Sequence, residues 1–277
     1  MTQPTRPILV IGSTGKTGSR IAAGLRAAGH PVRDGSRNAP IPFDWDDDTT
    51  WAASLDGVSA AYVSYFPDLA FPGASDRIAA LSALARQMGV GRLVLLSGRG
   101  ETHAEACEQI IRDSGVDFTL LRCAWFMQNF TEGYLRDPVI AGSIALPAGR
   151  VEEPMIDVDD IAEVAIAALT EPHHGGQLYE ITGPEMLDFD KAAAILSQAT
   201  GRTVTYTPIT LEDFRTAMTA IAGSFVADVF THVCEEALDG RNAWLGDGVQ
   251  RALGRPPRSF AQVCARAAAS GAWQEAA

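Results

Sequence analysis

Short apolar runs alternate with amphipathic stretches along the first half of this chain. Runs typical of buried strands occur at Ile8–Ile11, Pro31–Ser36, Ala60–Ser64, Arg92–Ser97 and Phe118–Arg122. Helical patterns separate them at Lys16–Ala28, Thr50–Leu55, Asp76–Met88 and Ala104–Asp113. This alternation predicts parallel strands joined by right-handed helical crossovers, which is the α/β doubly wound (Rossmann) sheet.

The pattern loosens after about residue 123. Helices are predicted at Val158–Leu169, Phe189–Ala199, Leu211–Ala220 and Phe260–Ala269, and short strands at Leu178–Ile181 and Thr203–Thr207. We expect residues 1–150 to form an NAD(P)-binding domain. Residues 151–277 are expected to form a smaller α/β region that covers the substrate and is interleaved with the last strand of the main sheet.

The first strand runs directly into a glycine-spaced turn and then a helix. Backbone N–H groups at such a helix N-terminus, together with the helix dipole, favour an anion. The first glycine permits the tight turn, the second lets the backbone approach a pyrophosphate, and the third lets the helix pack on the strand. The predicted phosphate-binding residues are Gly12, Ser13, Thr14, Gly15, Lys16, Thr17 and Gly18.

Two other interpretations of this loop are open. Gly15-Lys16-Thr17 resembles the end of a Walker A loop, but that motif needs a glycine five positions before Gly15, where the chain has Val10. A tight strand–helix turn that binds no ligand is the second alternative. The position of the loop after the first strand favours a dinucleotide.

The end of the second predicted strand bears on the choice of cofactor. An arginine there pairs with the 2′-phosphate of NADP, whereas an acid bonds the ribose of NAD. Ser36 and Arg37 stand at this end, while Asp34 falls inside the strand, too early to reach the ribose. The sequence therefore favours NADP(H), with a solvated Arg37 as the alternative. Asp44-Trp45, after a further short strand, either frames the adenine or forms a plain turn.

Composition narrows the classes of function. The chain has 277 residues, of which 47% are hydrophobic and 20% charged, and its net charge of −12 argues against a nucleic-acid partner. The four cysteines are far apart, without metal-ligand spacing, so we expect no metal site and a reducing, cytoplasmic location. No apolar run reaches the roughly 18 residues of a membrane span. A homodimer is one arrangement that the sequence leaves open.

Ligands of doubly wound sheets bind beyond the carboxyl ends of the strands. This rule adds Tyr65 to the predicted cofactor site, together with Ser97, Gly98 and Arg99. Arg99 could clamp a phosphate or stay on the surface. An aromatic-rich segment follows the Phe118–Arg122 strand and could form an apolar wall or pack into the core. The predicted substrate-binding residues are Phe66, Trp125, Phe126, Asn129 and Phe130.

The usual proton donor of short-chain reductases is missing. These enzymes combine a serine with a Tyr-x-x-x-Lys pair, in which the tyrosine protonates the carbonyl oxygen as hydride arrives. Ser97 occupies the serine position, but the helix after it contains no tyrosine and no lysine. A protonated imine, a quinone or an azo group can accept hydride without such a donor. No catalytic residue is assigned from the sequence.

Several motifs resemble the NmrA-like atypical short-chain dehydrogenases/reductases. They are Gly12–Gly18, the segments at 31–37 and 95–100, the segment at 119–130, Leu238–Asn242 and Gly248–Arg258. Within this family the chain is most similar to the ergot-alkaloid reductases (the festuclavine synthase and agroclavine dehydrogenase types), on the Gly-Lys-Thr-Gly variant and on Phe43-Asp44-Trp45. The resemblance implies NADPH-dependent reduction, of an iminium in that branch and of quinones or azo compounds in others.

The leading prediction is an NADPH-dependent reductase that transfers hydride to a small activated acceptor, an imine or iminium. Quinone or azo reduction is the alternative within the family. A non-catalytic redox sensor, which the resemblance also implies, explains the missing tyrosine and lysine equally well. A further alternative is an isomerase or lyase that uses the cofactor structurally.

Overall fold

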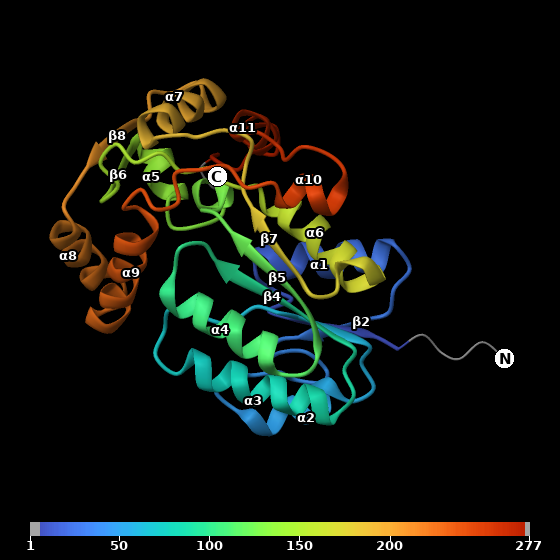
Figure 1. Cartoon of the computed structure of the whole chain (residues 1–277). Helices are drawn as coiled ribbons and strands as arrows, with labels where there is room; N and C mark the ends of the chain where they lie inside the picture. The colour runs from blue at the N-terminus through green and yellow to red at the C-terminus, as the bar shows by residue number, and fades with distance from the viewer. Residues whose placement is uncertain (1–5, 275–277) are drawn as a thin grey trace.

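A computed structural model describes residues 6–274. Its main feature is a six-stranded, fully parallel sheet in the order β2-β1-β3-β4-β5-β7 (Figure 1). The strands are β1 (Ile8–Ile11), β2 (Val32–Gly35), β3 (Ala60–Val63), β4 (Arg92–Gly98), β5 (Asp117–Cys123) and β7 (Gln177–Ile181). The strand order reverses direction beside β1, so the predicted doubly wound sheet is confirmed.

Helices cover both faces of this sheet. One face packs against α1 (Lys16–Ala27), α6 (Val158–Thr170) and α10 (Gly248–Leu253). The other face packs against α2 (Trp51–Leu55), which follows the 3₁₀ turn η1 (Asp48–Thr50), and against α3 (Ala74–Gln87) and α4 (Thr102–Asp113). Each face buries its own apolar cluster, which explains why the central strands β1 and β3 are continuous apolar runs. The edge strand β2 is only half-buried over most of its length and carries Arg33 and Asp34.

A smaller region lies beyond the carboxyl ends of the strands, at the upper left of Figure 1. Two parallel strands, β6 (Ser143–Leu146) and β8 (Thr205–Pro208), pair there. A third apolar cluster fills this region. Its helical elements are η2 (Met127–Phe130), α5 (Arg136–Ala141), α7 (Phe189–Thr200), α8 (Leu211–Ala222), α9 (Ser224–Ala237) and α11 (Phe260–Ala269).

The chain passes between the two regions more than once. After β6 it returns to the large sheet as α6, the short 3₁₀ turn η3 (Pro172–His174) and the edge strand β7. The buried carboxylates of Asp157 and Asp160 fix the start of α6, where Asp157 caps the helix and Asp160 accepts hydrogen bonds from Arg255 and Arg258. The division of the chain at residue 150 stays a prediction.

The sequence misplaced or missed some elements. The short strand expected just before Asp44 is wrong: residues 40–43 form a loop, in which Pro40 and Pro42 offer no N–H groups to a sheet. The elements β6, α5, α9 and α10 were not predicted. Elsewhere the predicted boundaries agree with the structure within one to three residues.

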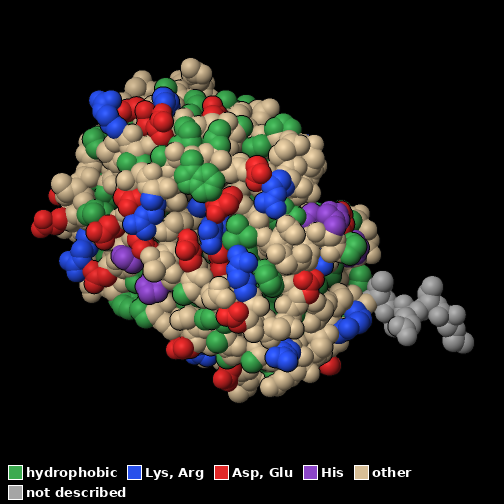
Figure 2. Space-filling model, viewed as in Figure 1, with side chains coloured by type: hydrophobic (Ala, Val, Ile, Leu, Met, Phe, Trp, Pro, Cys, Tyr) green, Lys and Arg blue, Asp and Glu red, His purple; other side chains and the backbone are tan. Residues whose placement is uncertain are grey.

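Charges are mixed on the surface. On the face drawn in Figure 2, acidic side chains are interspersed with basic ones, and no broad basic area is seen there. Among residues 6–274, no helix combines the length and the apolar character that crossing a membrane requires.

Candidate functional site

A cavity of about 740 Å³ lies at the carboxyl ends of β1, β3, β4 and β5. Residues of α8 and α9 line the side that faces away from the sheet. Most of the residues predicted for the site line this cavity: Gly12, Thr14, Gly15, Lys16, Thr17, Ser36, Arg37, Asp44, Trp45, Tyr65, Phe66, Ser97, Gly98, Arg99, Trp125, Phe126 and Asn129.

The glycine loop forms one end of the cavity. Gly12 adopts a φ of +76°, its N–H donates to the Gly35 carbonyl at 2.8 Å, and Gly15 in turn donates to the Gly12 carbonyl at 2.9 Å. Gly15 is the N-cap of α1, and neither a side-chain cap nor an acidic residue occupies the first turn. The N–H groups that start α1 are therefore free to bind an anion.

Two residues of the loop do not line the cavity. Ser13 is only 8% exposed, and Gly18 packs α1 against the loop. A Cβ atom at position 18 would lie 2.1 Å from the carbonyl oxygen of Gly12. The structure therefore supports the packing role of Gly18, the third glycine of the loop. Ser13 does not line the cavity.

Lys16 reaches from α1 across the cavity. Its Nζ donates to Oδ1 of Asn129 at 3.1 Å. Burial lowers the pKa of Lys16, although the nearby Glu132 acts in the opposite direction. The amide of Asn129 thus holds the ammonium group at the junction between the phosphate loop and the aromatic segment.

Arg37 is the free cation at the end of β2. It is exposed, lines the cavity and makes no ion pair with any residue that the structure describes. Asp34 lies within β2 and forms an ion pair with Arg26. Arg33 donates to the carbonyl groups of Ala53, Ser54 and Asp56. Of these charged groups only Arg37 is available to a 2′-phosphate.

Aromatic packing fixes the neighbouring loop. Trp45 donates through Nε1 to the Ser64 carbonyl at 3.1 Å, and its ring lies 4.8 Å from that of Tyr65, centroid to centroid. Trp51 donates to the carbonyl of Asp44 at 2.6 Å. These contacts hold Asp44 and Trp45 at the cavity although no strand precedes them.

The side chains of Ser97 and Arg99 are both hydrogen-bonded to other residues of the protein. The Ser97 hydroxyl donates to Oε1 of Glu108 at 2.6 Å, and Glu108 also accepts from Arg122. The Arg99 guanidinium donates to Glu180 and to the carbonyl oxygens of Asn242 and Trp244, at 2.9–3.0 Å. It is 3% exposed, so the side chain is a structural clamp and offers no free N–H fork to a phosphate.

Ser97→Ala is expected to lower stability while largely sparing catalysis. The substitution removes a buried hydrogen bond to a carboxylate, which contributes about 1.5–3 kcal/mol. We expect a lower melting temperature and a kcat within about threefold of wild type, because the hydroxyl already donates its hydrogen to Glu108. Thermal unfolding and steady-state kinetics check both expectations. A 100-fold loss of kcat with unchanged stability would contradict this assignment.

The aromatic segment after β5 divides between the cavity and the core. Trp125, Phe126 and Asn129 line the cavity, whereas Phe130 is fully buried beside the rings of Phe189 and Phe260. The predicted substrate contact through Phe130 is therefore not supported. The 3₁₀ turn η2 rotates this side chain away from its neighbours and into the core of the smaller region.

Several residues that line the cavity were missed. Asp68, Glu101 and Glu153 bring three carboxyl groups to it, and Tyr134 adds a phenol. Burial, with Asp68 and Glu236 nearby, raises the pKa of Glu101 to about 8. The apolar contribution of α8 and α9 was also missed: Phe214, Met218, Phe230, Val233 and Cys234. The helical spacing of Phe214 and Met218, and of Phe230, Val233 and Cys234, indicates an apolar helix face but not what that face covers, because segments distant in sequence bring these residues together.

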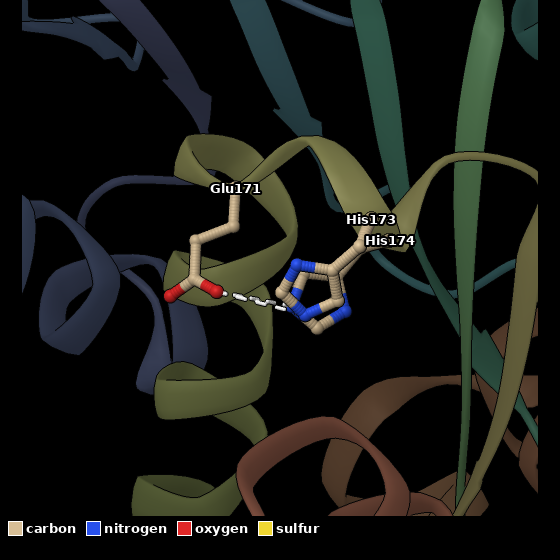
Figure 3. Close-up of side chains that lie close together, drawn as sticks. All are labelled: Glu171, His173 and His174. Carbon is tan, nitrogen blue, oxygen red and sulfur yellow. Dashed lines mark ion pairs between the residues drawn. The ribbon is translucent and has the colours of Figure 1, made fainter.

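A separate cluster lies at the opposite end of the strands, before β7. Glu171, His173 and His174 gather there (Figure 3), with Oε2 of Glu171 at 3.6 Å and 3.8 Å from the two Nε2 atoms. Nδ1 of His174 hydrogen-bonds the hydroxyl of Tyr179 at 2.7 Å. Arg92 donates to the carbonyls of Glu171 and Pro172, which anchors this turn to the sheet.

Comparisons with known proteins agree with this architecture. A model of the NmrA-like family matches residues 105–239. The chain is 33% identical to an NAD(P)H azoreductase from Xenophilus azovorans, over 96% of this chain and 99% of the relative. It is 35% identical to festuclavine dehydrogenase from Aspergillus fumigatus, over 74% of this chain and 78% of the relative.

The fold is also similar to that of a solved structure. The NADPH complex of an NADPH-dependent quinone oxidoreductase from Escherichia coli superposes with a TM-score of 0.76, over 94% of this chain and 99% of the other, at 21% identity.

Proposed function

Because this chain belongs to the NmrA-like family, we propose that it reduces an activated C=N acceptor, an imine or iminium, with NADPH. At the coarser level the protein is an NADP(H)-dependent oxidoreductase. One observation carries the proposal: a single cavity joins the glycine loop to an aromatic wall. The sequence of the helix after Ser97 agrees with it, because this helix contains neither a tyrosine nor a lysine.

The residues present fit a dinucleotide. The uncapped start of α1 and the Gly12–Gly18 loop suit a pyrophosphate, and Arg37 suits a 2′-phosphate. Trp45 and Tyr65, whose ring centroids lie 4.8 Å apart, add apolar surface to the same cavity. When bound, the cofactor supplies a hydride, and the chain's task is to hold an acceptor carbon next to it.

The substrate end favours a flat, partly apolar acceptor. Phe66, Trp125 and Phe126 line it from the sheet side, and Met218 and Phe230 from α8 and α9. Simple ketones need a proton on oxygen as hydride arrives, which the usual tyrosine would supply. An imine nitrogen is far more basic than a ketone oxygen, so an imine becomes an electrophilic iminium without the tyrosine that ketone reduction requires.

Quinone or azo reduction is the second candidate. The similarity to an azoreductase over nearly the whole chain favours it. A redox sensor is supported less well, because the cavity continues past the glycine loop to a wall formed by Phe66, Trp125 and Phe126, which a protein that only binds cofactor does not need. The four buried, unpaired cysteines support a cytoplasmic location, and a homodimer stays a prediction.

Cofactor consumption by the purified protein tests the proposal. The panel is a cyclic imine, a quinone, an azo dye and a simple ketone, each with NADPH and in parallel with NADH. We expect turnover of the imine with NADPH and none of the ketone. Turnover of only the quinone or the azo dye would show that the acceptor is a quinone or an azo compound and not an imine. Tight NADPH binding without any turnover would favour the sensor.

A further inference from the structure

Two buried polar atoms in the cavity have no partner. Oε2 of Glu153 and Nε1 of Trp125 make no hydrogen bond with any residue between 6 and 274. Both residues line the cavity, and Glu153 is only 2% exposed. Buried polar atoms are nearly always satisfied, so two unsatisfied atoms on residues that line one cavity point to a polar ligand that would enter beside them.

Glu153 is held rigidly at this position. Its backbone exchanges hydrogen bonds with Leu187 at 2.9 Å and 3.1 Å, and Oε1 accepts from the backbone N–H of Trp125 at 3.3 Å. One carboxyl oxygen is thus bound to the segment after β5, while Oε2 has no partner among residues 6–274. These contacts hold the side chain in one position, on a buried residue that lines the cavity.

The surroundings of Glu153 favour the protonated, neutral form of its carboxyl group. Burial raises the pKa of Glu153 to about 7, and the Trp125 N–H and the charge of Arg99 offset only part of this rise. The Arg99 charge is itself paired with Glu180. Asp68 and Glu101 line the same cavity from the loop after β3 and the start of α4, and burial raises the pKa of both. A carboxyl group with a pKa near the working pH is suited to proton transfer.

We propose that Glu153 is the proton donor of this reductase, and that its substrate is a neutral imine which is protonated inside the cavity. This inference rests on the proposed function. The carboxyl O–H gives its proton to the imine nitrogen, and the hydride from NADPH then forms the C–H bond as the C=N π electrons become the nitrogen lone pair. Glu153 is left as a carboxylate and regains a proton from solvent. The indole N–H of Trp125 donates to a second acceptor atom of the substrate.

The first test compares Glu153→Gln with the wild type on two acceptors that differ in their need for a proton. A neutral cyclic imine requires one, and its N-methyl iminium salt does not. We expect Glu153→Gln to lower kcat for the imine by about 100-fold or more, the range of general acid catalysis. We expect kcat for the iminium salt to change by less than about threefold. Glu152→Gln is the matched control, because this exposed neighbour pairs with Lys191 and does not line the cavity.

An equal loss on both acceptors would overturn the proposal, since it would show a general disturbance of the site.

A second measurement does not depend on the acceptor. In ¹³C NMR spectra of glutamate-labelled protein, the carboxyl signal that disappears in Glu153→Gln should titrate near pH 7. A midpoint near the ordinary value of about 4.3 would overturn the proposal even if the imine is reduced. A midpoint near 7 in a protein that reduces no imine would support the acid and refute only the acceptor class.

Discussion

Arg37→Asp is expected to raise the Kd for NADPH by about 100-fold or more and to change the Kd for NADH by only a few-fold. Arg37 is the one charged side chain at the end of β2 that lines the cavity without a protein partner among the described residues. A charge-assisted hydrogen bond contributes about 1.5–3 kcal/mol, and the new carboxylate adds repulsion against a phosphate. A loss of about 2.7 kcal/mol corresponds to 100-fold in Kd.

Fluorescence titration with both cofactors measures the effect. Arg26→Ala is the control: Arg26 is a neighbouring cation paired with Asp34, and it lies outside the cavity lining. This control should leave the ratio of the two Kd values unchanged. Equal weakening of NADPH and NADH by Arg37→Asp would mean that Arg37 does not contact the 2′-phosphate.

Gly18→Ala is expected to lower the free energy of unfolding by about 3 kcal/mol and to weaken NADPH at least about tenfold. The new methyl group would lie 2.1 Å from the Gly12 carbonyl oxygen, 2.7 Å from its carbon and 3.1 Å from the Ser13 Cα. All three are backbone atoms, so the methyl cannot be accommodated by a rotamer change. Either α1 moves away from the loop or the loop opens, and both changes disturb the phosphate cradle.

Urea denaturation and NADPH titration check the two effects. Gly29→Ala separates this clash from backbone strain, because Gly29 has a φ of +82° and open space where a Cβ would be placed. The control should cost about 1 kcal/mol and leave NADPH affinity unchanged. A Gly18→Ala protein as stable as the Gly29→Ala control would refute the packing role.

The centre of the main sheet was predictable because strands such as β1 and β3 are buried along their whole length. A continuous apolar run such as Ile8–Ile11, followed by glycines and an amphipathic helix, has few alternative structures. The same logic located the cavity, since parallel strands present their carboxyl ends at one edge. Both inferences depend on local pattern and general topology, which a single sequence contains.

The hydrogen-bond partners and the burial of individual side chains were less predictable. Ser97 and Arg99 lie at the predicted edge, but their bonds to Glu108, Glu180 and Asn242 depend on partners up to 143 residues away. Phe130, the last residue of η2, is buried in the core of the smaller region. The run of aromatic residues in the sequence did not distinguish this position from one that lines the cavity. Glu153 carries no local signal, since its burial comes from pairing with Leu187.

The position of β7 has a consequence for synthesis of the protein on the ribosome. This edge strand pairs with β5, which ends at Cys123, yet β7 itself is completed only at Ile181. Helix α6, which covers much of one sheet face, is completed at Thr170. A nascent chain therefore emerges with an open β5 edge and an uncovered apolar face for more than 40 residues of elongation. At about 5–20 residues per second this exposure lasts seconds, which makes the interval before β7 docks the time when the chain most needs a chaperone.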